Sequence, residues 1–303
     1  MGIFRFKEFF VKDDVSAMKV GTDAVMLGAV MTLSSEDRTL LDIGTGSGII
    51  SLMVAQRLSM MKSDVQSFFI DAIDVDSGAA AEAAENFSAS KWDDSLRSIH
   101  FSLEGYTELL MGKGLELVCE GVSRGIFQGS SKDVSGFVSG NYLGDVSSGF
   151  FELASKESVD GVDFSVLGTQ RKYDVIFSNP PYFDFSLQSP DARRAAARNS
   201  DVGLSYREII DFAVEFLSDC GRLSLVLPAS VEGDLIGYAL SRGLSPFRIV
   251  RARSVARKAP VRIIAEFSFA HNDSPEELLL TINGEGGYTS EYTEFVRDFY
   301  LNL

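Results

Sequence analysis

The tetrapeptide Asn179-Pro180-Pro181-Tyr182 carries the groups best suited to chemistry in this sequence. The Asn179 carboxamide oxygen and a backbone carbonyl, such as that of Pro180, can accept hydrogen bonds from both N–H groups of a planar amino group. The nitrogen then becomes more pyramidal and its lone pair points at an electrophile, so positioning replaces a general base. Tyr182 offers a ring face for stacking. The predicted nucleophile is the exocyclic amine of adenine or a glutamine amide; the alternative is a proline turn with Tyr182 as ordinary packing.

An apolar run at residues 174–178 comes directly before this tetrapeptide. Its length suits a buried strand, and the prolines end the strand because proline fixes φ and donates no ladder hydrogen bond. Asn179 is therefore expected at the carboxyl end of a strand, the edge where open α/β sheets bind ligands.

A glycine-rich turn follows an earlier apolar strand. Residues 40–43 run into the sequence G-T-G-S-G at 44–48, and residues 49–58 continue with helical apolar spacing. Glycines let the backbone approach a ligand without an intervening Cβ. The spacing differs from the G-x-G-x-x-G of dinucleotide folds, so a pyrophosphate is not the expected ligand. A tight turn without a ligand is the alternative.

Acidic residues end the next expected strand, at residues 67–76. Asp74 is placed to accept hydrogen bonds from both hydroxyls of a ribose. Asp76 is placed to cap the helix expected from Ser77 to Asn86. Either acid could serve as the cap, and we assign the ribose to Asp74 and the cap to Asp76.

The glycine loop, the ribose acid and Asn-Pro-Pro-Tyr, in this order and each at a strand end, resemble the class I methyltransferases that use S-adenosylmethionine (SAM) and methylate amino nitrogens. Residues 4–9 and 18–29 look like the opening of the bacterial valine-tRNA adenine N6-methyltransferases, which modify the adenosine next to the anticodon. Residues 292–301 resemble the closing helix of one bacterial branch. The similarity covers most of residues 4–109 and 172–303.

The resemblance implies a role for each matching position. Asp42 and Gly44 would lie near the methionine part of SAM, and Asp74 would hold the ribose. The residues implied to hold the target adenine are Asn179, Pro180, Pro181 and Tyr182. Those implied to contact SAM are Lys19, Thr22, Asp23, Asp42, Gly44, Thr45, Gly46, Gly48, Asp74, Val75 and Glu104.

Two of these assignments have specific alternatives. Glu104 is chosen because the contact to the adenine ring of SAM normally follows the third strand, expected here at residues 99–103. Lys19 and Asp23 would lie beside the glycine loop, and the alternative is that they cap the helix beginning at Thr22 on the surface.

The order of segments predicts a doubly wound α/β sheet. A strand pair at the N-terminus and a helix from Thr22 precede strands near residues 40, 69, 99 and 175, and helices precede strands near 223 and 249. The fifth strand is expected at residues 221–228 and the last at 261–269. The resemblance supplies the Rossmann-like class I methyltransferase fold, with seven mostly parallel strands and an antiparallel last strand.

Residues 111–171 depart from the family pattern. The segment is rich in glycine and serine, lacks proline, and lies between the third and fourth strands. Its composition indicates a mobile or loosely paired insertion, or a small β lid. It is either an elaboration without catalytic groups or a contact for RNA or a partner subunit. Residues 1–110 and 172–303 are expected to form a single SAM-dependent methyltransferase domain.

Composition sets further bounds. With 303 residues and 45% hydrophobic content, the chain can bury the core of one large α/β domain plus the insertion. Cys119 and Cys220 lie far apart without ligand spacing, which predicts a reducing compartment and no metal site. No apolar run suits a membrane span, and no secretory signal begins the chain, so a cytoplasmic protein is expected. Monomer and homodimer both stay open.

The net charge of −15 argues against a nucleic-acid substrate, because phosphate contacts need lysine and arginine. Local clusters weaken that objection, since a local field can be positive where the average is negative. A solvated face is the alternative for each cluster. The basic residues predicted to contact RNA are Arg193, Arg194, Arg198, Arg251, Arg253, Arg257 and Lys258.

The leading hypothesis is a SAM-dependent enzyme that methylates N6 of an adenosine in the anticodon loop of valine tRNA. A release-factor glutamine N5-methyltransferase would share the tetrapeptide, but that family carries a helical N-terminal domain and only about 20 residues precede Thr22. A ribosomal-RNA or DNA adenine methyltransferase would share the chemistry, yet no target-recognition domain is evident. A non-catalytic SAM-binding RNA assembly factor would not require the intact tetrapeptide.

Overall fold

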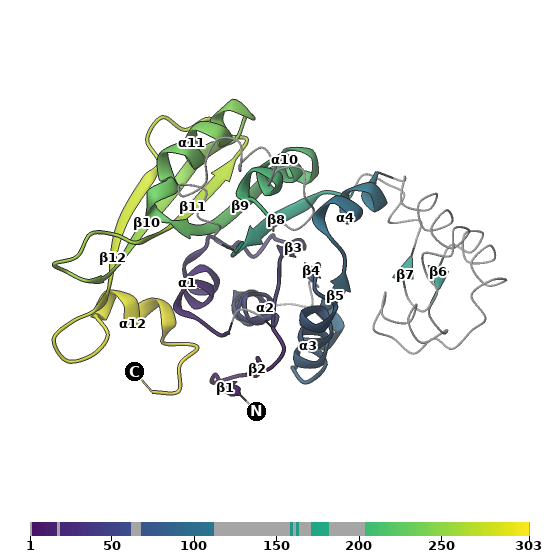
Figure 1. Ribbon diagram of the computed structural model, residues 1–303, viewed down its shortest axis with the longest axis horizontal. Helices are drawn as coiled ribbons and strands as arrows, with labels where there is room; N and C mark the ends of the chain where they lie inside the picture. The colour runs from purple at the N-terminus through teal and green to yellow at the C-terminus, as the bar shows by residue number, and fades with distance from the viewer. Residues whose placement is uncertain are drawn as a thin grey trace, which may run out of the picture.

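An eight-stranded sheet forms the centre of the computed structural model, in the order β12-β10-β11-β9-β8-β3-β4-β5 (Figure 1). The structure describes residues 2–16, 19–61, 68–111, 158–159, 162–163, 171–181 and 204–302. The strands of this sheet are β3 (Thr39–Ile43), β4 (Phe69–Asp74), β5 (Leu96–His100), β8 (Tyr173–Ser178), β9 (Leu217–Pro228), β10 (Ser245–Val255), β11 (Arg262–Ser268) and β12 (Glu276–Asn283).

Strand directions confirm the doubly wound, mostly parallel sheet. Strands β5, β4, β3, β8 and β9 are paired in parallel, and β11 is antiparallel to both β9 and β10. The predicted antiparallel strand at residues 261–269 is thus confirmed, but it is not the last strand, because β12 follows it. The predicted total of seven strands was wrong, because β12 adds an eighth, parallel to β10.

Two expected strand boundaries also differ from the structure. The third strand, β5, ends at His100 and does not extend to residue 103. The reason is local: Ser102 is the N-cap of the next helix, and its side chain accepts a hydrogen bond from the Gly105 amide. The fifth strand, β9, begins at Leu217, earlier than expected, and pairs with β8 across an irregularity in register.

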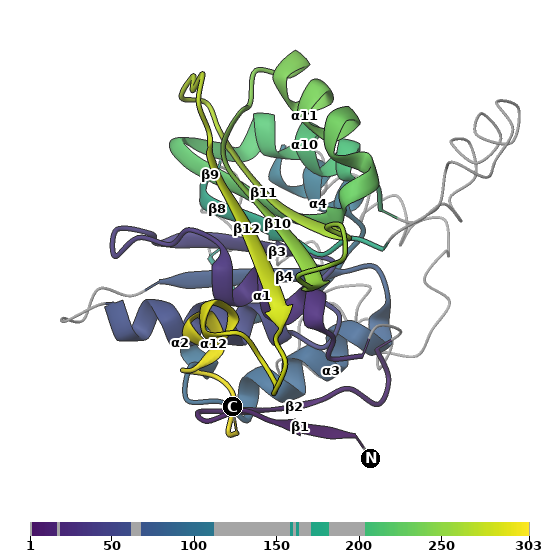
Figure 2. The same cartoon turned by 90° about the vertical axis from the view of Figure 1, so that its left-hand side faces the viewer.

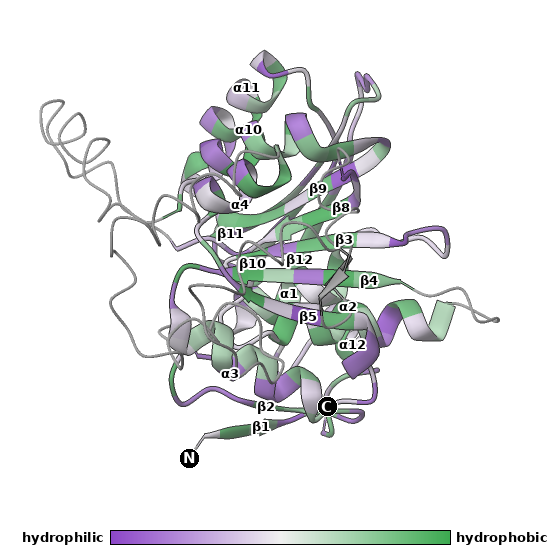
Figure 3. Cartoon of the chain, turned by 90° about the vertical axis from the view of Figure 1, so that its right-hand side faces the viewer, coloured by the Kyte–Doolittle hydropathy of each residue, from purple (hydrophilic) through white to green (hydrophobic). Residues whose placement is uncertain are grey.

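Helices cover both faces of the sheet, as Figures 1 and 3 show. On one face lie α1 (Thr22–Val30), α2 (Ile49–Met61), α3 (Ser77–Ser88) and α12 (Ser290–Val296), and on the other lie α4 (Leu103–Leu110), α10 (Tyr206–Phe216) and α11 (Glu232–Ser241). Short 3₁₀ turns occur at η1 (Asp93–Ser95) and η3 (Ala229–Val231).

Each face of the sheet has its own hydrophobic core. On β8, Val175 and Phe177 pack in the core with α1 and α2, whereas Ile176 packs in the core with α4 and α10. Side chains of a strand point alternately to opposite faces, so a strand buried on both sides is apolar almost throughout. This explains why the apolar runs in the sequence marked the central strands correctly.

The two ends of the described chain lie together (Figure 2). Strands β1 (Ile3–Arg5) and β2 (Phe10–Lys12) form the antiparallel pair expected at the N-terminus. The turn between them joins the C-terminal segment, because the Lys7 amide donates to the Phe299 carbonyl at 2.8 Å. Phe6 stacks on Tyr300 with ring centroids 6.1 Å apart.

A buried charge network joins the segments on either side of the insertion. Asp71 on β4 is fully buried and pairs with Arg97 at 2.8 Å and Arg171 at 2.9 Å. It also accepts a hydrogen bond from the Tyr106 hydroxyl, which lies 2.7 Å from that of Tyr173. Burial, together with the Asp71 carboxylate, raises the pKa of both tyrosines, which therefore stay neutral donors.

Most of residues 111–171 lie outside the described residues. Two short strands of this stretch are described, β6 (Ser158–Val159) and β7 (Val162–Asp163), and they pair antiparallel. They follow α4 and precede β8 in chain order. That residues 111–171 form an insertion stays a prediction. A role as a lid or an RNA contact stays a prediction. Within the described ranges, no helix has both the length and the apolar character that crossing a bilayer requires.

Candidate active site

The glycine loop connects β3 to α2 at the carboxyl edge of the sheet. Gly44, Gly46 and Gly48 have φ values of 73°, 56° and 81°, in the left-handed region that favours glycine. The amides of Gly44 and Thr45 donate to the Ile73 carbonyl at 2.9 and 3.0 Å, which fixes the loop to the end of β4. The turn is thus held in place by its backbone.

Gly46 and Gly48 have different surroundings. A Cβ added at Gly48 would lie 2.5 Å from the ring of Phe87 on α3, so this glycine allows α3 to pack closely. A Cβ added at Gly46 would meet no atom of the described residues within 4 Å. Among the same residues, a Cβ at Gly44 would meet Leu204 alone, at 3.5 Å, a residue just before α10 that the sequence did not suggest. The described part of the chain therefore leaves open space beside Gly46.

Asp42 is fully buried beneath the loop. One carboxylate oxygen accepts hydrogen bonds from the Thr45 and Ser51 hydroxyls at 2.8 and 2.7 Å. The other, Oδ1, has no partner among the described residues. Burial raises the pKa of Asp42 to about 7, against the two hydroxyl bonds, and the nearby Asp74 adds to the rise. A buried acceptor without a donor is costly, so Oδ1 favours a ligand that carries N–H groups.

Asp74 ends β4 and connects two turns. Its Oδ2 accepts from the Gly46 amide at 2.8 Å and its Oδ1 from the Asp76 amide at 2.9 Å. Burial raises its pKa. Asp76 caps α3 by accepting from the amides of Gly78 and Ala79, which confirms Asp76 as the predicted cap. Ribose binding by Asp74 stays a prediction, as does a contact from the exposed Val75.

Asn179 lies directly beside the glycine loop. Ile43 and Ser178 are paired in the parallel ladder of β3 and β8, so the next residues, Gly44 and Asn179, leave the sheet side by side. The Ser178 hydroxyl donates to the Ile43 carbonyl at 2.6 Å and tightens this junction. Asn179 is half-buried and Pro180 buried, while Pro181 is exposed. Tyr182 lies outside the described residues, and its stacking role stays a prediction.

Helix α1 begins at Thr22, as expected. Lys19 is exposed and donates from Nζ to the carbonyls of Asp13 and Asp14. Gly21 is the N-cap and makes no side-chain cap hydrogen bond. The alternative that Lys19 and Asp23 cap the helix on the surface stays a prediction. Asp23 pairs with Arg262 on β11 at 2.7 Å. SAM contacts from Lys19, Thr22 and Asp23 stay predictions.

Glu104 is exposed in the first turn of α4 and does not end a strand. The residue that follows β5 is Phe101, whose amide donates to the Asp74 carbonyl at 3.0 Å. Phe101 is therefore a second candidate, missed from the sequence, for the contact to the adenine ring of SAM. The missed signal was the apolar ring directly after the strand.

The predicted RNA-binding residues that the structure describes differ in their surroundings. Arg251 pairs with Glu232 and Glu277 at 2.5 and 2.8 Å, so its charge is already neutralised within the fold. Arg253 donates to the Thr281 hydroxyl at 2.9 Å. Arg257 and Lys258 are exposed in the turn between β10 and β11. Of the predicted residues, Arg193, Arg194 and Arg198 lie outside the described residues.

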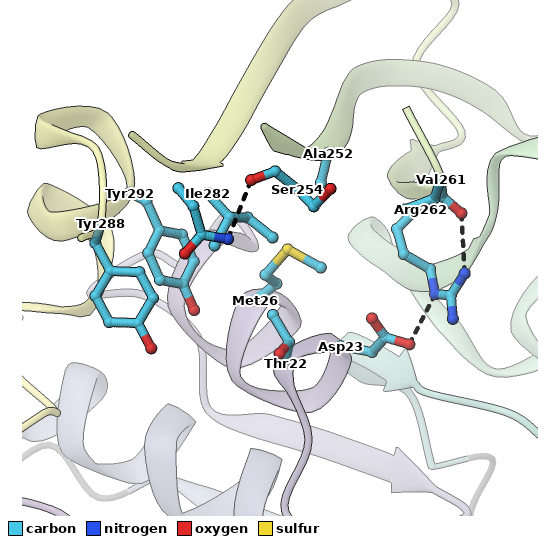
Figure 4. Close-up of a pocket in the computed structure, with 11 residues that line it drawn as sticks. Thr22, Asp23, Met26, Ala252, Ser254, Val261, Arg262, Ile282, Tyr288 and Tyr292 are labelled. Atoms are coloured by element: carbon cyan, nitrogen blue, oxygen red, sulfur yellow. Dashed lines mark hydrogen bonds and ion pairs between the residues drawn. The ribbon is translucent and has the colours of Figure 1, made fainter. Parts of the chain in front are cut away.

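A pocket of about 340 Å³ lies next to the start of α1, as Figure 4 shows. It is lined by Thr22 and Asp23, and by residues near the carboxyl ends of β10 and β12. No cluster of His, Cys, Asp or Glu suited to a metal ion occurs in the parts of the chain that the structure describes.

Proteins that are similar in sequence to this chain share one name. No family model matches the chain. It is 33% identical over 300 residues to a tRNA1(Val) (adenine(37)-N6)-methyltransferase from Bacteroides fragilis, covering 99% of this chain and 98% of the relative. A protein of the same name from Christiangramia forsetii is 31% identical, with coverage of 99% and 98%.

Among solved structures, the fold is similar to a crystal structure described as a predicted O-methyltransferase from Agrobacterium tumefaciens. The TM-score is 0.50 at 13% identity, and the match covers 91% of this chain and 96% of that one. At this identity the likeness shows the fold alone.

Proposed function

Because the chain belongs to the family of tRNA1(Val) (adenine(37)-N6)-methyltransferases, we propose that it transfers a methyl group from SAM to the exocyclic N6 of an adenosine in the anticodon loop of valine tRNA. The observation that carries the proposal is the near full-length similarity to these relatives. The pairing that brings Asn179 beside the glycine loop supports it. We propose that the reaction takes place in the cytoplasm.

The residues of the loop region fit SAM. The unpaired Oδ1 of Asp42 suits the amino group of the methionine part, the open space beside Gly46 leaves room for a ligand, and the Asp74 carboxylate suits a ribose. When bound, SAM supplies an electrophilic methyl group on a sulfonium sulfur. Asp42, Gly44, Gly46 and Asp74 are the residues that would hold it.

Asn179 and Pro180 act on the other substrate. The exocyclic amine of adenine is a poor nucleophile because its lone pair is delocalised into the ring. The Asn179 side-chain oxygen and the Pro180 carbonyl accept hydrogen bonds from its two N–H groups and orient its lone pair out of the ring plane. Tyr182 stacks on the base. The chain thus supplies orientation and electrostatic stabilisation.

The target base must leave its stack to reach this site. Sequence-specific RNA recognition mostly uses loops whose bases can be splayed out, and unstacking costs a few kcal/mol. An anticodon loop meets this requirement better than a duplex. The half-buried position of Asn179 at the sheet edge agrees with a base that enters from solvent.

Nucleoside mass spectrometry tests the proposal. Unmodified valine tRNA and, separately, total RNA are incubated with the purified chain and isotopically labelled SAM. Labelled N6-methyladenosine from the anticodon loop is the expected result. No label in either RNA, although SAM binding is measured by calorimetry, would overturn the proposal and make a protein glutamine the next substrate to test.

A further inference from the structure

The pocket beside α1 lies on the same edge of the sheet as Asn179. Strands β8, β9, β10 and β12 run in the same direction, so their carboxyl ends share one edge, where the antiparallel β11 begins at Arg262. With about 4.8 Å between neighbouring strands, β11 at the near side of the pocket lies roughly 10 Å from β8, and β12 at its far side lies roughly 19 Å from β8. An RNA loop that offers a base to Asn179 can therefore reach this pocket.

Three kinds of group line the pocket (Figure 4). Met26 and Ile282 provide apolar surface. On one side lie the rings of Tyr288 and Tyr292, with centroids 5.0 Å apart, and Tyr288 is 45% exposed. On the opposite side is the guanidinium of Arg262, held by Asp23.

Hydrogen-bonding groups complete the lining. Ser254 and Asn283 come from the ends of β10 and β12, and the Asn283 amide donates to the Ser254 carbonyl at 3.1 Å. An aromatic face, an amide, a hydroxyl and a guanidinium around an apolar floor suit a nucleobase, which is planar and carries hydrogen-bonding groups on its edges.

The β10–β11 turn adds positive charge next to the pocket. It connects Ser254 to Arg262, which both line the pocket, and it carries Arg257 and Lys258. Both side chains are exposed, and neither has a hydrogen bond or ion pair to other described residues, unlike Arg251 on β10. In a chain of net charge −15, such unneutralised cations suit a phosphate backbone.

We propose that this pocket is a second nucleotide subsite, which binds a nucleotide of the tRNA anticodon loop next to the target adenosine. Its base stacks on Tyr288, and the backbone beside it contacts Arg257 and Lys258. The subsite rests on the proposed function, because it names how the same RNA is held. It fixes the register of the loop, so that the correct base reaches Asn179.

The test combines protein variants with RNA variants. The RNA is a stem-loop with the sequence of the valine anticodon arm, either intact or with one abasic nucleotide at each position flanking the target adenosine. Binding is measured by fluorescence anisotropy for wild type and Tyr288→Ala. Tyr288→Phe is the matched control, because it keeps the ring. SAM affinity and thermal unfolding are measured for every variant.

Tyr288→Ala should weaken binding of the intact RNA about 10-fold, with SAM affinity unchanged, and Tyr288→Phe should bind like wild type. At one flanking position, removal of the base should weaken binding of the RNA to wild type about 10-fold. The same removal should not weaken binding to Tyr288→Ala any further, because the ring that the base stacks on is already absent. If Tyr288→Ala does not fold, Ser254→Phe is used, which fills the pocket from β10 and should weaken binding to the same extent.

Equal binding of the intact RNA by wild type and the folded variant would overturn the subsite, as would fully additive effects at every flanking position. Methylation of the same RNA by wild type separates the two proposals. If wild type methylates the target adenosine while the variants bind normally, only the subsite fails. If wild type methylates neither this RNA nor valine tRNA, the proposed function fails.

Discussion

The carboxyl group of Asp42 is fully buried, and ionisation is unfavourable there. Its ordinary pKa of 3.8 rises to about 7 in the folded protein. The folded state therefore holds the proton more tightly than the unfolded state. Ionisation costs no stability below about pH 4, costs increasingly more between pH 4 and 7, and costs a constant amount above pH 7.

Asp42→Asn should accordingly gain stability relative to wild type as the pH rises. The gain at pH 8 over pH 5 should be on the order of 1–3 kcal/mol, because the variant cannot ionise. Urea unfolding at both pH values measures it. The same variant should bind SAM more weakly, since the carboxylate is removed. A stability difference that is identical at pH 5 and pH 8 would contradict the raised pKa.

Asn179→Ala should lower turnover about 10²- to 10³-fold, because one of two acceptors that orient the amine is removed. SAM binding should stay nearly unchanged, since Asn179 holds the other substrate. Single-turnover rates with labelled SAM and calorimetry measure the two effects. The exposed Asn302 provides the control substitution, Asn302→Ala. Most activity retained in Asn179→Ala would contradict the positioning role.

At the scale of elements, two glycines of the loop have different roles. Gly48 allows α3 to pack closely, whereas Gly46 leaves space for a ligand. Gly48→Ala should destabilise the fold by several kcal/mol, because a Cβ there would lie 2.5 Å from Phe87 and φ is 81°. Gly46→Ala should cost only about 1 kcal/mol of stability, from its positive φ, but should reduce SAM affinity. Thermal unfolding and calorimetry on both variants test the difference. Equal destabilisation would show that Gly46 also serves packing.

The Asp71 network should be costly to break. Asp71→Ala leaves the half-buried Arg97 and Arg171 without their carboxylate and should cost about 3–5 kcal/mol of stability. The control Asp234→Ala removes an exposed pair with Arg207 and should cost at most about 1 kcal/mol. Urea unfolding measures both, and a cost for Asp71→Ala no larger than the control would refute the structural role.

Elements were predictable where burial leaves a simple pattern. The central strands appear as apolar runs because both faces are covered, and Asp76 marks the start of α3 as a cap. Strand β12 was missed because only Leu280 and Thr281 are buried in it, and the alternation of Leu278, Leu280 and Ile282 toward the core is interrupted by the exposed Leu279. The end of β5 was misplaced because Ser102 starts a helix within an apolar stretch.

At the scale of the whole molecule, the distribution of charge should control RNA binding. Replacing both Arg257 and Lys258 by Ala should flatten the dependence of log affinity on log salt by about 0.7 for each phosphate that the variant no longer neutralises. Filter binding of valine tRNA over a salt series measures the slope. Lys91→Ala, which removes a surface pair with Glu8, should leave the slope unchanged. An unchanged slope in the double variant would place the phosphates elsewhere.

The site could be predicted in part for a topological reason. The glycine loop, Asp74 and Asn179 each end a parallel strand, so knowing the strands was enough to bring them to one edge. The pocket beside α1 could not be found in this way. Its residues come from the start of α1, from three strands, and from the segment that carries Tyr288 and Tyr292. Only the folded structure brings these segments together.

The bonds from Tyr106 and Arg171 to Asp71 fasten the two stems of the insertion to the sheet. The entropy of closing a loop grows only slowly with its length once the ends are fixed. A change in the number of residues between Met111 and Arg171 should therefore alter the stability of the sheet only slightly, because both flanking segments stay bound to Asp71.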